Sequence, residues 1–406
     1  MCDTGGYGVI PVGFTPNTRT VMQIVVSGSP ATADAPYDLA ALQEAFTPTN
    51  PAVDGVFKKG QNPILVGQPA YNAAYDTLFD LVKPYWGFSN IFSTELNFKT
   101  VAGDSITIPM QPKAIQDEMG EVFDPEYGRM MGAMGVELPL TNAQNQNFVL
   151  QGYIDKPTEI IDMEMEALSP VAADGTQIWK ITHNGVDTHP VHFHEFDAQL
   201  INRVGWDGFI TLPDPTELGW KDTIRVSPLE DTIVAVRANM PKIPFGVPDS
   251  IRPLNPSAPI GSTEGFSPTD PYTGLPLATP VTNELYNFKW EYVWHCHILS
   301  HEEMDMMRPI QINVSTLLPG TPVLQAGGTA GGTISLRWTD PTPAAAPSTL
   351  GNLSNEIGFR IMRRPVNDAG VVIGPWAQIG TALANATTYT DSTTTVAKKY
   401  RYRVVA

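Results

Sequence analysis

The sequence has few cysteines, few basic residues and no long apolar run. Its two cysteines, Cys2 and Cys296, exclude a framework of disulfide bonds, because they could form one bridge at most. No apolar segment is long enough to cross a membrane, and no basic segment followed by an apolar one marks a signal peptide at the start. The 25 Lys and Arg residues against 42 Asp and Glu residues give a formal net charge of -17, which argues against nucleic acid as a partner.

Proline and glycine are frequent instead, at 37 and 34 residues, and they favour a chain with many turns over a helical bundle. Short β-type segments separated by turn residues run from residue 96 to residue 314 and indicate an all-β sandwich or barrel. The pattern predicts strands at 96–109 (two strands around a Gly-Asp turn), 160–168, 177–182, 192–202, 222–226, 231–236, 290–296 and 308–314. A proline-rich loop at 241–281 interrupts them.

The seven histidines fall in two short windows and are not spread along the chain. They are His183, His189, His192 and His194 in the first window, and His295, His297 and His301 in the second. Neutral imidazole is the commonest metal ligand in proteins, so this clustering indicates a metal site.

The second window also contains Cys296, and strand geometry separates the side chains around it. Alternate residues of a strand point to opposite faces, so Cys296 should face one way and His295 and His297 the other. His192 and His194 should share a face for the same reason. One strand would then serve two metal sites, with a thiolate on one side and imidazoles on the other.

On the thiolate side the expected ligands are His189, Cys296, His301 and Met306. Pro190 separates His189 from the histidines that follow it. Two imidazoles, a thiolate and a weak axial thioether make a blue (type 1) copper site. Zinc is the main rival, but structural zinc sites usually show paired Cys-x-x-Cys spacing, which the sequence lacks. A cysteine protease fits a cysteine flanked by two histidines poorly. The four imidazoles on the other face suit a cluster of several copper ions that handles dioxygen.

Both windows resemble the copper motifs of the multicopper oxidases. HPVHFH at 189–194 matches the motif H-P-x-H-x-H, and HCHILSH at 295–301, followed by Met306, matches H-C-H-x-x-x-H-x-x-x-x-M. The segment HCHILSHEEMDMM at 295–307 especially resembles the branch of bacterial laccases, bilirubin oxidases and manganese oxidases. The resemblance covers residues 18–314 and implies a cupredoxin-like Greek-key β-sandwich.

The resemblance also implies a role for each motif residue. Type 1 copper would be bound by His189, Cys296, His301 and Met306, type 2 copper by His192, and the type 3 pair by His194, His295 and His297. Electrons from a phenolic or metal-ion substrate such as Mn(II) would enter at type 1 copper and pass through Cys296 to a trinuclear cluster that reduces dioxygen to water. Glu302 would assist proton delivery. An extracellular or periplasmic location follows from the resemblance alone.

The sequence departs from the family in its histidine count. The family builds the trinuclear cluster from eight histidines, four of them in an N-terminal cupredoxin domain, and those four have no counterpart among the seven here. His183 is the spare histidine and is expected at the surface or behind a ligand. The chain is therefore expected to be the C-terminal part of an oxidase, or one subunit of a split oxidase whose partner chain supplies the missing histidines. A non-catalytic blue-copper electron-transfer protein is the alternative.

The expected domain order follows from these motifs. Residues 1–30, with one strand at 18–27, resemble the remnant of a preceding cupredoxin domain, 31–95 form a linker, and 96–316 form the copper-binding domain. Residues 320–406 contain expected strands at 333–338, 358–364 and 400–405, a core tryptophan at Trp338 and a candidate tyrosine corner at Tyr400 or Tyr402. They resemble a fibronectin type III module without its last strand.

Acidic and methionine residues near the thiolate leave the substrate open. They are Glu302, Glu303, Met304 and Asp305, and a further Met- and acid-rich segment at 117–138. Such residues could accept a metal-ion substrate, and they would equally serve for packing and solubility.

Overall fold

The computed structural model describes residues 38–46, 48–50, 65–66, 95–99, 105–117, 132–138, 147–164, 175–205, 209–239, 247–330, 332–341 and 354–406. The chain forms two compact units, Met1–Asn62 and Pro63–Ala406, and each is considered by itself. The strand expected at 18–27, Cys2 and residues 118–131 of the Met- and acid-rich segment lie outside the described residues.

The described part of the first unit contains one short helix, α1 (Leu39–Phe46). The Asp38 carboxylate accepts a hydrogen bond from the backbone N–H of Ala41 at 3.0 Å, the arrangement of a helix N-cap. The helix lies within residues 31–95, the range predicted to be a linker. Its signal was an aspartate directly before an alanine- and leucine-rich run.

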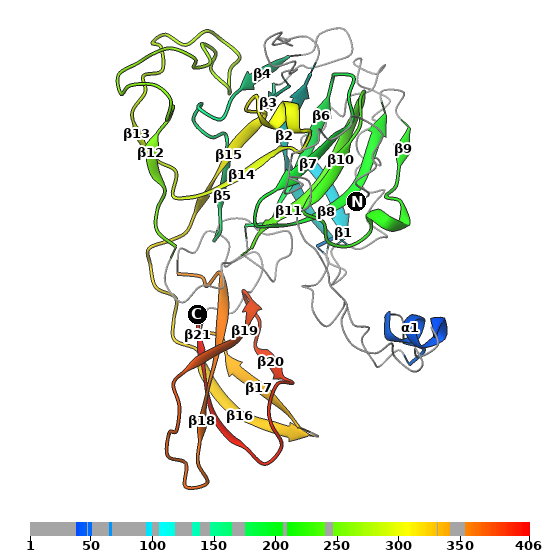
Figure 1. Cartoon of the computed structure of the whole chain (residues 1–406), viewed down its shortest axis with the longest axis vertical. Helices are drawn as coiled ribbons and strands as arrows, with labels where there is room; N and C mark the ends of the chain where they lie inside the picture. Colours follow the sequence, from blue (N-terminus) through cyan, green and yellow to red (C-terminus); the bar gives the residue numbers. More distant parts are fainter. Residues whose placement is uncertain are drawn as a thin grey trace, which may run out of the picture. The chain divides into compact units, whose positions relative to one another are not determined.

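Two sheets form the main domain of the second unit (Figure 1). In the larger sheet the strand order is β4 (Phe148–Gln151), β3 (Ala133–Glu137), β2 (Ser105–Gln116), β6 (Gln177–His183), β11 (Glu230–Ala238), β8 (Phe196–Gly205) and β9 (Ile210–Thr211), and β1 (Glu95–Lys99) also pairs with β2. In the smaller sheet the order is β10 (Thr223–Val226), β7 (His189–Phe193), β14 (Trp290–Cys296), β15 (Met307–Asn313) and β5 (Glu159–Asp162). The smaller elements are η2 (Pro215–Glu217), the pair β12 (Ile251–Pro253) and β13 (Leu285–Asn287), and α4 (Leu299–Glu302).

The hydrophobic core lies between these two sheets. Trp179 of β6 meets Trp294 of β14 edge to face, with ring centroids 5.3 Å apart, and also contacts Phe193 of β7 at 5.6 Å. Cys296 and Met306 belong to the same buried cluster, at 0% and 1% exposure. The expected thiolate site therefore forms part of the core of a cupredoxin-like β-sandwich, as the sequence predicted for the fold class.

One expected strand is divided in two. The range 192–202 contains the end of β7, a turn at His194 and Glu195, and most of β8. Glu195 has a φ of 58°, the left-handed conformation that reverses the chain, and an alternating polar and apolar pattern does not reveal such a turn. His194 consequently lies just beyond the end of β7. The strands expected at 177–182, 222–226, 231–236, 290–296 and 308–314 correspond to β6, β10, β11, β14 and β15.

The C-terminal residues form two further three-stranded sheets. One has the order β16 (Val323–Ala330), β17 (Thr333–Thr339) and β20 (Thr388–Asp391), and the other β19 (Ala377–Leu383), β18 (Gly358–Val366) and β21 (Lys399–Val405). Trp338 is buried against Phe359, as expected for a core tryptophan. The Tyr402 hydroxyl donates to the Asp391 carboxylate at 2.8 Å. Strands β16, β19 and β20 were not expected, and the fibronectin type III assignment stays a prediction.

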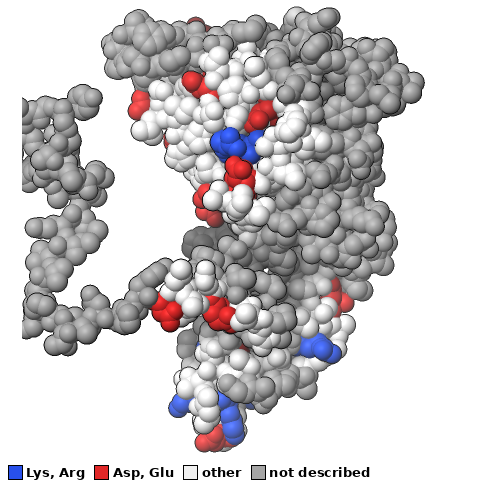
Figure 2. Space-filling view, turned by 90° about the vertical axis from the view of Figure 1, so that its right-hand side faces the viewer, with Lys and Arg blue, Asp and Glu red and all other residues white. Residues whose placement is uncertain are grey.

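The described residues carry neither a membrane-spanning helix nor, on the face in Figure 2, a single acidic patch. No helix among them has the length and apolar character needed to cross a membrane. On the described part of the face in Figure 2, acidic and basic side chains lie close to one another, and most of that surface is uncharged. The excess of acid is therefore not gathered into one patch there.

A buried ion pair joins the edge strand β5 to β15, and it provides a test of the fold. Arg308 and Glu159 are both fully buried, with Nη2 and Oε2 3.1 Å apart, and Arg308 also donates to the carbonyl of Gly152 at 2.7 Å. We expect Arg308→Ala to lower the free energy of unfolding by about 3–5 kcal/mol, because it removes the ion-pair partner of the buried Glu159 carboxylate. Urea denaturation followed by tryptophan fluorescence would measure it.

Lys156→Ala is the control, since Lys156 pairs with Glu284 at 2.7 Å with both side chains about half exposed. It should cost less than about 1 kcal/mol. Equal losses in the two variants would show that the buried pair does not hold the sheet edge.

Candidate metal centre

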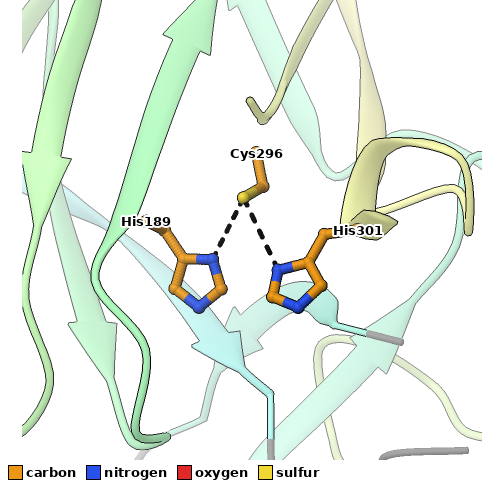
Figure 3. Close-up of side chains that lie close together, drawn as sticks. All are labelled: His189, Cys296 and His301. Carbon is orange, nitrogen blue, oxygen red and sulfur yellow. Dashed lines mark hydrogen bonds between the residues drawn. The ribbon is translucent and has the colours of Figure 1, made fainter. Parts of the chain in front are cut away.

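Cys296 lies between two imidazoles at the end of the core (Figure 3). Its Sγ atom is 3.0 Å from Nδ1 of His189 and 3.7 Å from Nδ1 of His301. The three residues are at most 1% exposed. They come from the end of β14, the start of β7 and the short helix α4, so three separate elements converge on one buried point.

A tight connection after β14 places His301 and Met306. The backbone N–H of His301 donates to the carbonyl of Ile298, and the N–H of Met306 donates to the carbonyl of His301 at 3.0 Å. The N–H of Cys296 in turn donates to the carbonyl of Met306 at 3.1 Å. These hydrogen bonds close the segment from Cys296 to Met306 into a loop around the sulfur atom, with successive members of the three residues five positions apart in the chain.

The Met306 sulfur also faces this pocket. A Cβ atom placed on Gly132 would lie 2.4 Å from Sδ of Met306 and 3.4 Å from Nδ1 of His301, so the glycine leaves room for both side chains. Met306 is 1% exposed, whereas Met304 and Met307 are partly exposed. Of the three methionines near His301, Met306 is therefore the one beside the imidazoles.

Asp117, at the end of β2, holds the far side of the His189 ring. Its Oδ2 atom lies 3.0 Å from Nε2 of His189, and its two oxygens accept hydrogen bonds from the backbone N–H groups of Val186 and Asp187, each at 2.8 Å. Burial works against ionisation, yet the hydrogen bonds from His189 and these amides hold the pKa of Asp117 well below its usual range. The carboxylate places the ring proton on Nε2 and leaves the Nδ1 lone pair pointing at Cys296.

His183 is fully buried and is not a surface residue. Its ring packs edge to face on His189, with centroids 4.9 Å apart. Nδ1 accepts a hydrogen bond from the N–H of Gly185 at 3.0 Å, and Nε2 lies 2.6 Å from the carbonyl of Asp187. Both ring nitrogens are thus occupied, and His183 supports the pocket from behind His189, one of the two positions expected for it.

These donors fit a soft transition metal. Two imidazole nitrogens, a thiolate and a thioether converge in an apolar core, and each donor type suits copper. Burial raises the pKa of the Cys296 thiol to about 11, so its thiolate form needs a positive charge beside it. A metal cation in the pocket would supply that charge.

The other four expected ligands form an imidazole cluster, defined as His192, His194, His295 and His297. Ring centroids lie 4.8 Å apart for His192 and His194, 4.9 Å for His295 and His297, and 5.1 Å for His194 and His295. Nε2 of His194 is 3.0 Å from Nε2 of His295. His295 is buried, while His194 and His297 are exposed.

Backbone carbonyls orient two of these rings. Nδ1 of His192 lies 2.9 Å from the carbonyl of Asp222, and Nδ1 of His295 lies 3.1 Å from the carbonyl of Cys296. A carbonyl requires a donor, so in the neutral rings the proton sits on Nδ1 and the lone pair on Nε2, which is the atom that would bind a metal. The strand alternation expected from the sequence therefore corresponds to two groups of donors on opposite sides of Cys296.

Glu302 lies next to the imidazole cluster. Its Oε2 atom is 3.5 Å from Nδ1 of His297 and 3.8 Å from Nδ1 of His295. This oxygen atom is buried and makes no hydrogen bond within the described residues. It is thus available to a water molecule or a proton at the edge of the cluster.

Sequence reasoning missed the supporting roles of Asp117 and Gly132. Asp117 was counted only as one acid of the Met- and acid-rich segment, because 72 positions separate it from His189 in the chain. Gly132 carries no donor atom at all. Of the methionines in that segment, Met134 lies in the core between the sheets.

Comparisons with known proteins find similarity to copper oxidases. Residues 138–243 match the family model described as multicopper oxidase. The laccase of Bacillus subtilis (strain 168) is 29% identical over 150 residues, which is 34% of this chain and 20% of that laccase. The laccase of Haloferax volcanii is 30% identical over 137 residues, which is 34% of this chain and 15% of the laccase. The chain thus spans about a fifth or less of the length of these relatives.

Among solved structures, the McoA multicopper oxidase of the hyperthermophile Aquifex aeolicus is similar over 39% of this chain and 22% of its own, with 22% identity and a TM-score of 0.23. The class of protein is defined by the β-sandwich, its buried Cys-His-His pocket and the adjoining imidazole cluster. The family match and both motifs make this part of the chain similar to the multicopper oxidases.

The Asp117 carboxylate gives a prediction about metal binding. In Asp117→Asn an amide N–H would replace the oxygen that now accepts from Asp187 and His189. His189 would relieve the clash by moving its proton to Nδ1, which removes the lone pair that faces Cys296. We expect copper affinity to fall about 10–100-fold, as for other residues that orient metal-binding imidazoles. Copper titration against a competing chelator would measure it.

Asp197→Asn is the matched control, because Asp197 of β8 pairs with Arg237 of β11 at 2.9 Å and is not one of the expected ligands. It should leave the affinity within about twofold. Unchanged affinity in Asp117→Asn would show that the carboxylate does not select the ring nitrogen.

Proposed function

We propose that this chain is a copper-dependent oxidoreductase component: the part of a multicopper oxidase that takes electrons from a reducing substrate and passes them toward dioxygen. The residues proposed to hold type 1 copper are His189, Cys296, His301 and Met306. Those proposed for part of the trinuclear cluster are His192 for type 2 copper, and His194, His295 and His297 for the type 3 pair.

One observation carries the proposal. The Cys296 side chain points into the buried pocket with His189 and His301, while its two chain neighbours carry imidazoles on the opposite side. The shortest covalent path between the two donor groups therefore runs from the Cys296 side chain through its backbone to the neighbouring residues His295 and His297. Copper, when bound, would supply one-electron redox chemistry at the first group and the reduction of dioxygen to water at the second.

The chain's own residues would prepare both groups. Asp117 and the carbonyls of Asp222 and Cys296 orient imidazole rings, so little rearrangement is needed when a metal binds. The core around Cys296 excludes water from the sulfur atom. Glu302, with a buried oxygen that has no hydrogen-bond partner among the described residues, would hold a proton beside His297 and release it during dioxygen reduction.

The family builds its trinuclear cluster from eight histidines, and we propose that the other four come from another part of the protein or from a partner chain. The exposed edges of His194 and His297 would face those histidines. The reductant is proposed to be a phenol or a metal ion such as Mn(II), and the location extracellular or periplasmic. The domain limits 96–316 and 320–406, the latter as a partial fibronectin type III module, are part of the same proposal.

A second candidate is a non-catalytic blue-copper electron-transfer protein. It is favoured by the contrast between the two donor groups, because the thiolate pocket is fully buried while two of the four imidazoles of the cluster are exposed. Under this reading the pocket would exchange electrons with a partner, and the imidazole cluster would have no part in catalysis.

The visible absorption spectrum of the copper-loaded chain tests the type 1 assignment. The chain loaded with copper should show an intense visible band from charge transfer between the Cys296 thiolate and copper, and Cys296→Ser should abolish it. Cys2→Ser, which alters the other cysteine, is the matched control and should keep the band. A band that survives in Cys296→Ser, or is absent from the loaded wild type, would rule the assignment out.

Dioxygen consumption separates the oxidase from the carrier. With a phenolic reductant, the copper-loaded chain alone should keep its visible band and consume no dioxygen above a metal-free control, because half of the cluster histidines are missing from it. Addition of the histidine-bearing domains or partner chain should start consumption, and His295→Ala should stop it again. Rapid dioxygen reduction by this chain alone would contradict the proposal that its cluster is incomplete. If no dioxygen is consumed after the histidine-bearing domains or partner chain are added, the electron-transfer protein is favoured.

A further inference from the structure

The C-terminal module, residues 320–406, has the opposite charge balance from the rest of the chain. It carries eight basic and four acidic residues, a formal net charge of +4, within a chain of net charge -17. The basic residues are Arg337, Arg360, Arg363, Arg364, Lys398, Lys399, Arg401 and Arg403. Such segregation is not needed for solubility, so it suggests a surface with an anionic partner.

The acidic residues of the module do not neutralise most of these cations. Asp391 is buried and pairs with Arg363 at 2.8 Å, and Asp368 pairs with Lys399 at 3.6 Å. The other two, Asp340 and Glu356, are buried at 6% and 2% exposure. Within the described part of the module, the remaining arginines form no ion pair with a carboxylate.

Four of those arginines share one side of a sheet and are called here the arginine face: Arg360 and Arg364 on β18, and Arg401 and Arg403 on β21. Their neighbours Ile361 and Val404 are a cross-strand pair that points into the core of the module. Because strand residues alternate, the arginines point out of the opposite side.

Within the arginine face, cations lie close to one another. Arg364 is the direct cross-strand partner of Arg401, a placement of like charges that destabilises a sheet. Trp376 lies under two guanidinium groups, with Arg364 at 4.4 Å and Arg403 at 4.7 Å from its ring centre. The tryptophan holds both side chains in place, and it does not remove their repulsion.

Hydrogen bonds to protein acceptors do not use all the donors of the arginine face. Among the described residues, Arg401 donates to the carbonyl of Gly370 at 3.0 Å. Guanidinium groups offer two parallel N–H donors to a carboxylate or a sulfate. An anion bound across Arg364 and Arg401 from the exposed side would relieve the repulsion between them.

We propose that the arginine face binds an acidic polysaccharide. Same-side residues of one strand are about 7 Å apart and neighbouring strands about 5 Å apart, so the guanidinium groups match a linear polymer that carries a charge on each sugar or pair of sugars. Single-stranded nucleic acid is less suitable, because it binds by stacking bases on free aromatic rings and Trp376 is already covered by guanidinium groups.

The test uses the full chain, with polygalacturonate and heparin as carboxylate and sulfate probes, and dextran and single-stranded DNA for comparison. Isothermal titration at several salt concentrations should show binding to at least one acidic polysaccharide and none to dextran. Arg401→Gln/Arg403→Gln should weaken it at least about tenfold and lower the slope of log affinity against log salt by about one per arginine removed. The visible copper band should be unchanged, because neither arginine belongs to the metal centre.

Arg337→Gln/Lys398→Gln is the matched control, since it removes the same charge from exposed positions outside the arginine face. It should bind within about twofold of the wild type. Equal weakening in both double variants would overturn the proposal, because net charge alone would then explain binding. So would tighter binding to DNA than to either polysaccharide, or no binding to either by the wild type.

Discussion

The pairing of β7 with β14 is the constraint on which the metal centre depends. It places His192 opposite His295, and Val191 opposite Cys296, although about a hundred positions separate the two strands in the sequence. A one-residue slip in this register would turn each side chain to the other side of the sheet and separate the sulfur atom from its imidazoles. The aromatic core beneath these strands, with Trp179 packed on Trp294, holds the register.

The thiolate pocket and the imidazole cluster, on opposite sides of this strand pair, differ in how far the protein encloses them. The thiolate pocket is closed by its own domain: a carboxylate behind His189, a fully buried His183 and a short loop that returns Met306 to the sulfur atom. The imidazole cluster is oriented by backbone carbonyls and remains exposed at His194 and His297. The thiolate pocket is therefore closed within its own domain, and the imidazole cluster is open at its edge.

A good part of this was predictable from the sequence. The windows 189–194 and 295–301 have spacings that identify the donors locally, and strand alternation assigns each donor a side, so the division into two groups could be predicted before any coordinates. The all-β class and most strands of the main domain followed from short alternating segments. The turn at Glu195 could not be predicted, because a left-handed residue other than glycine leaves no mark in such a pattern.

By itself the sequence determined which residues are candidate metal ligands and how they divide into two groups, since ligand chemistry and strand periodicity are local properties. Only the tertiary structure decided what supports them. Asp117 reaches His189 from another strand, Gly132 makes room for Met306, and Arg364 meets Arg401 across a sheet. Each of these is a contact between distant segments, and its partner depends on strand register and packing, which no local pattern specifies.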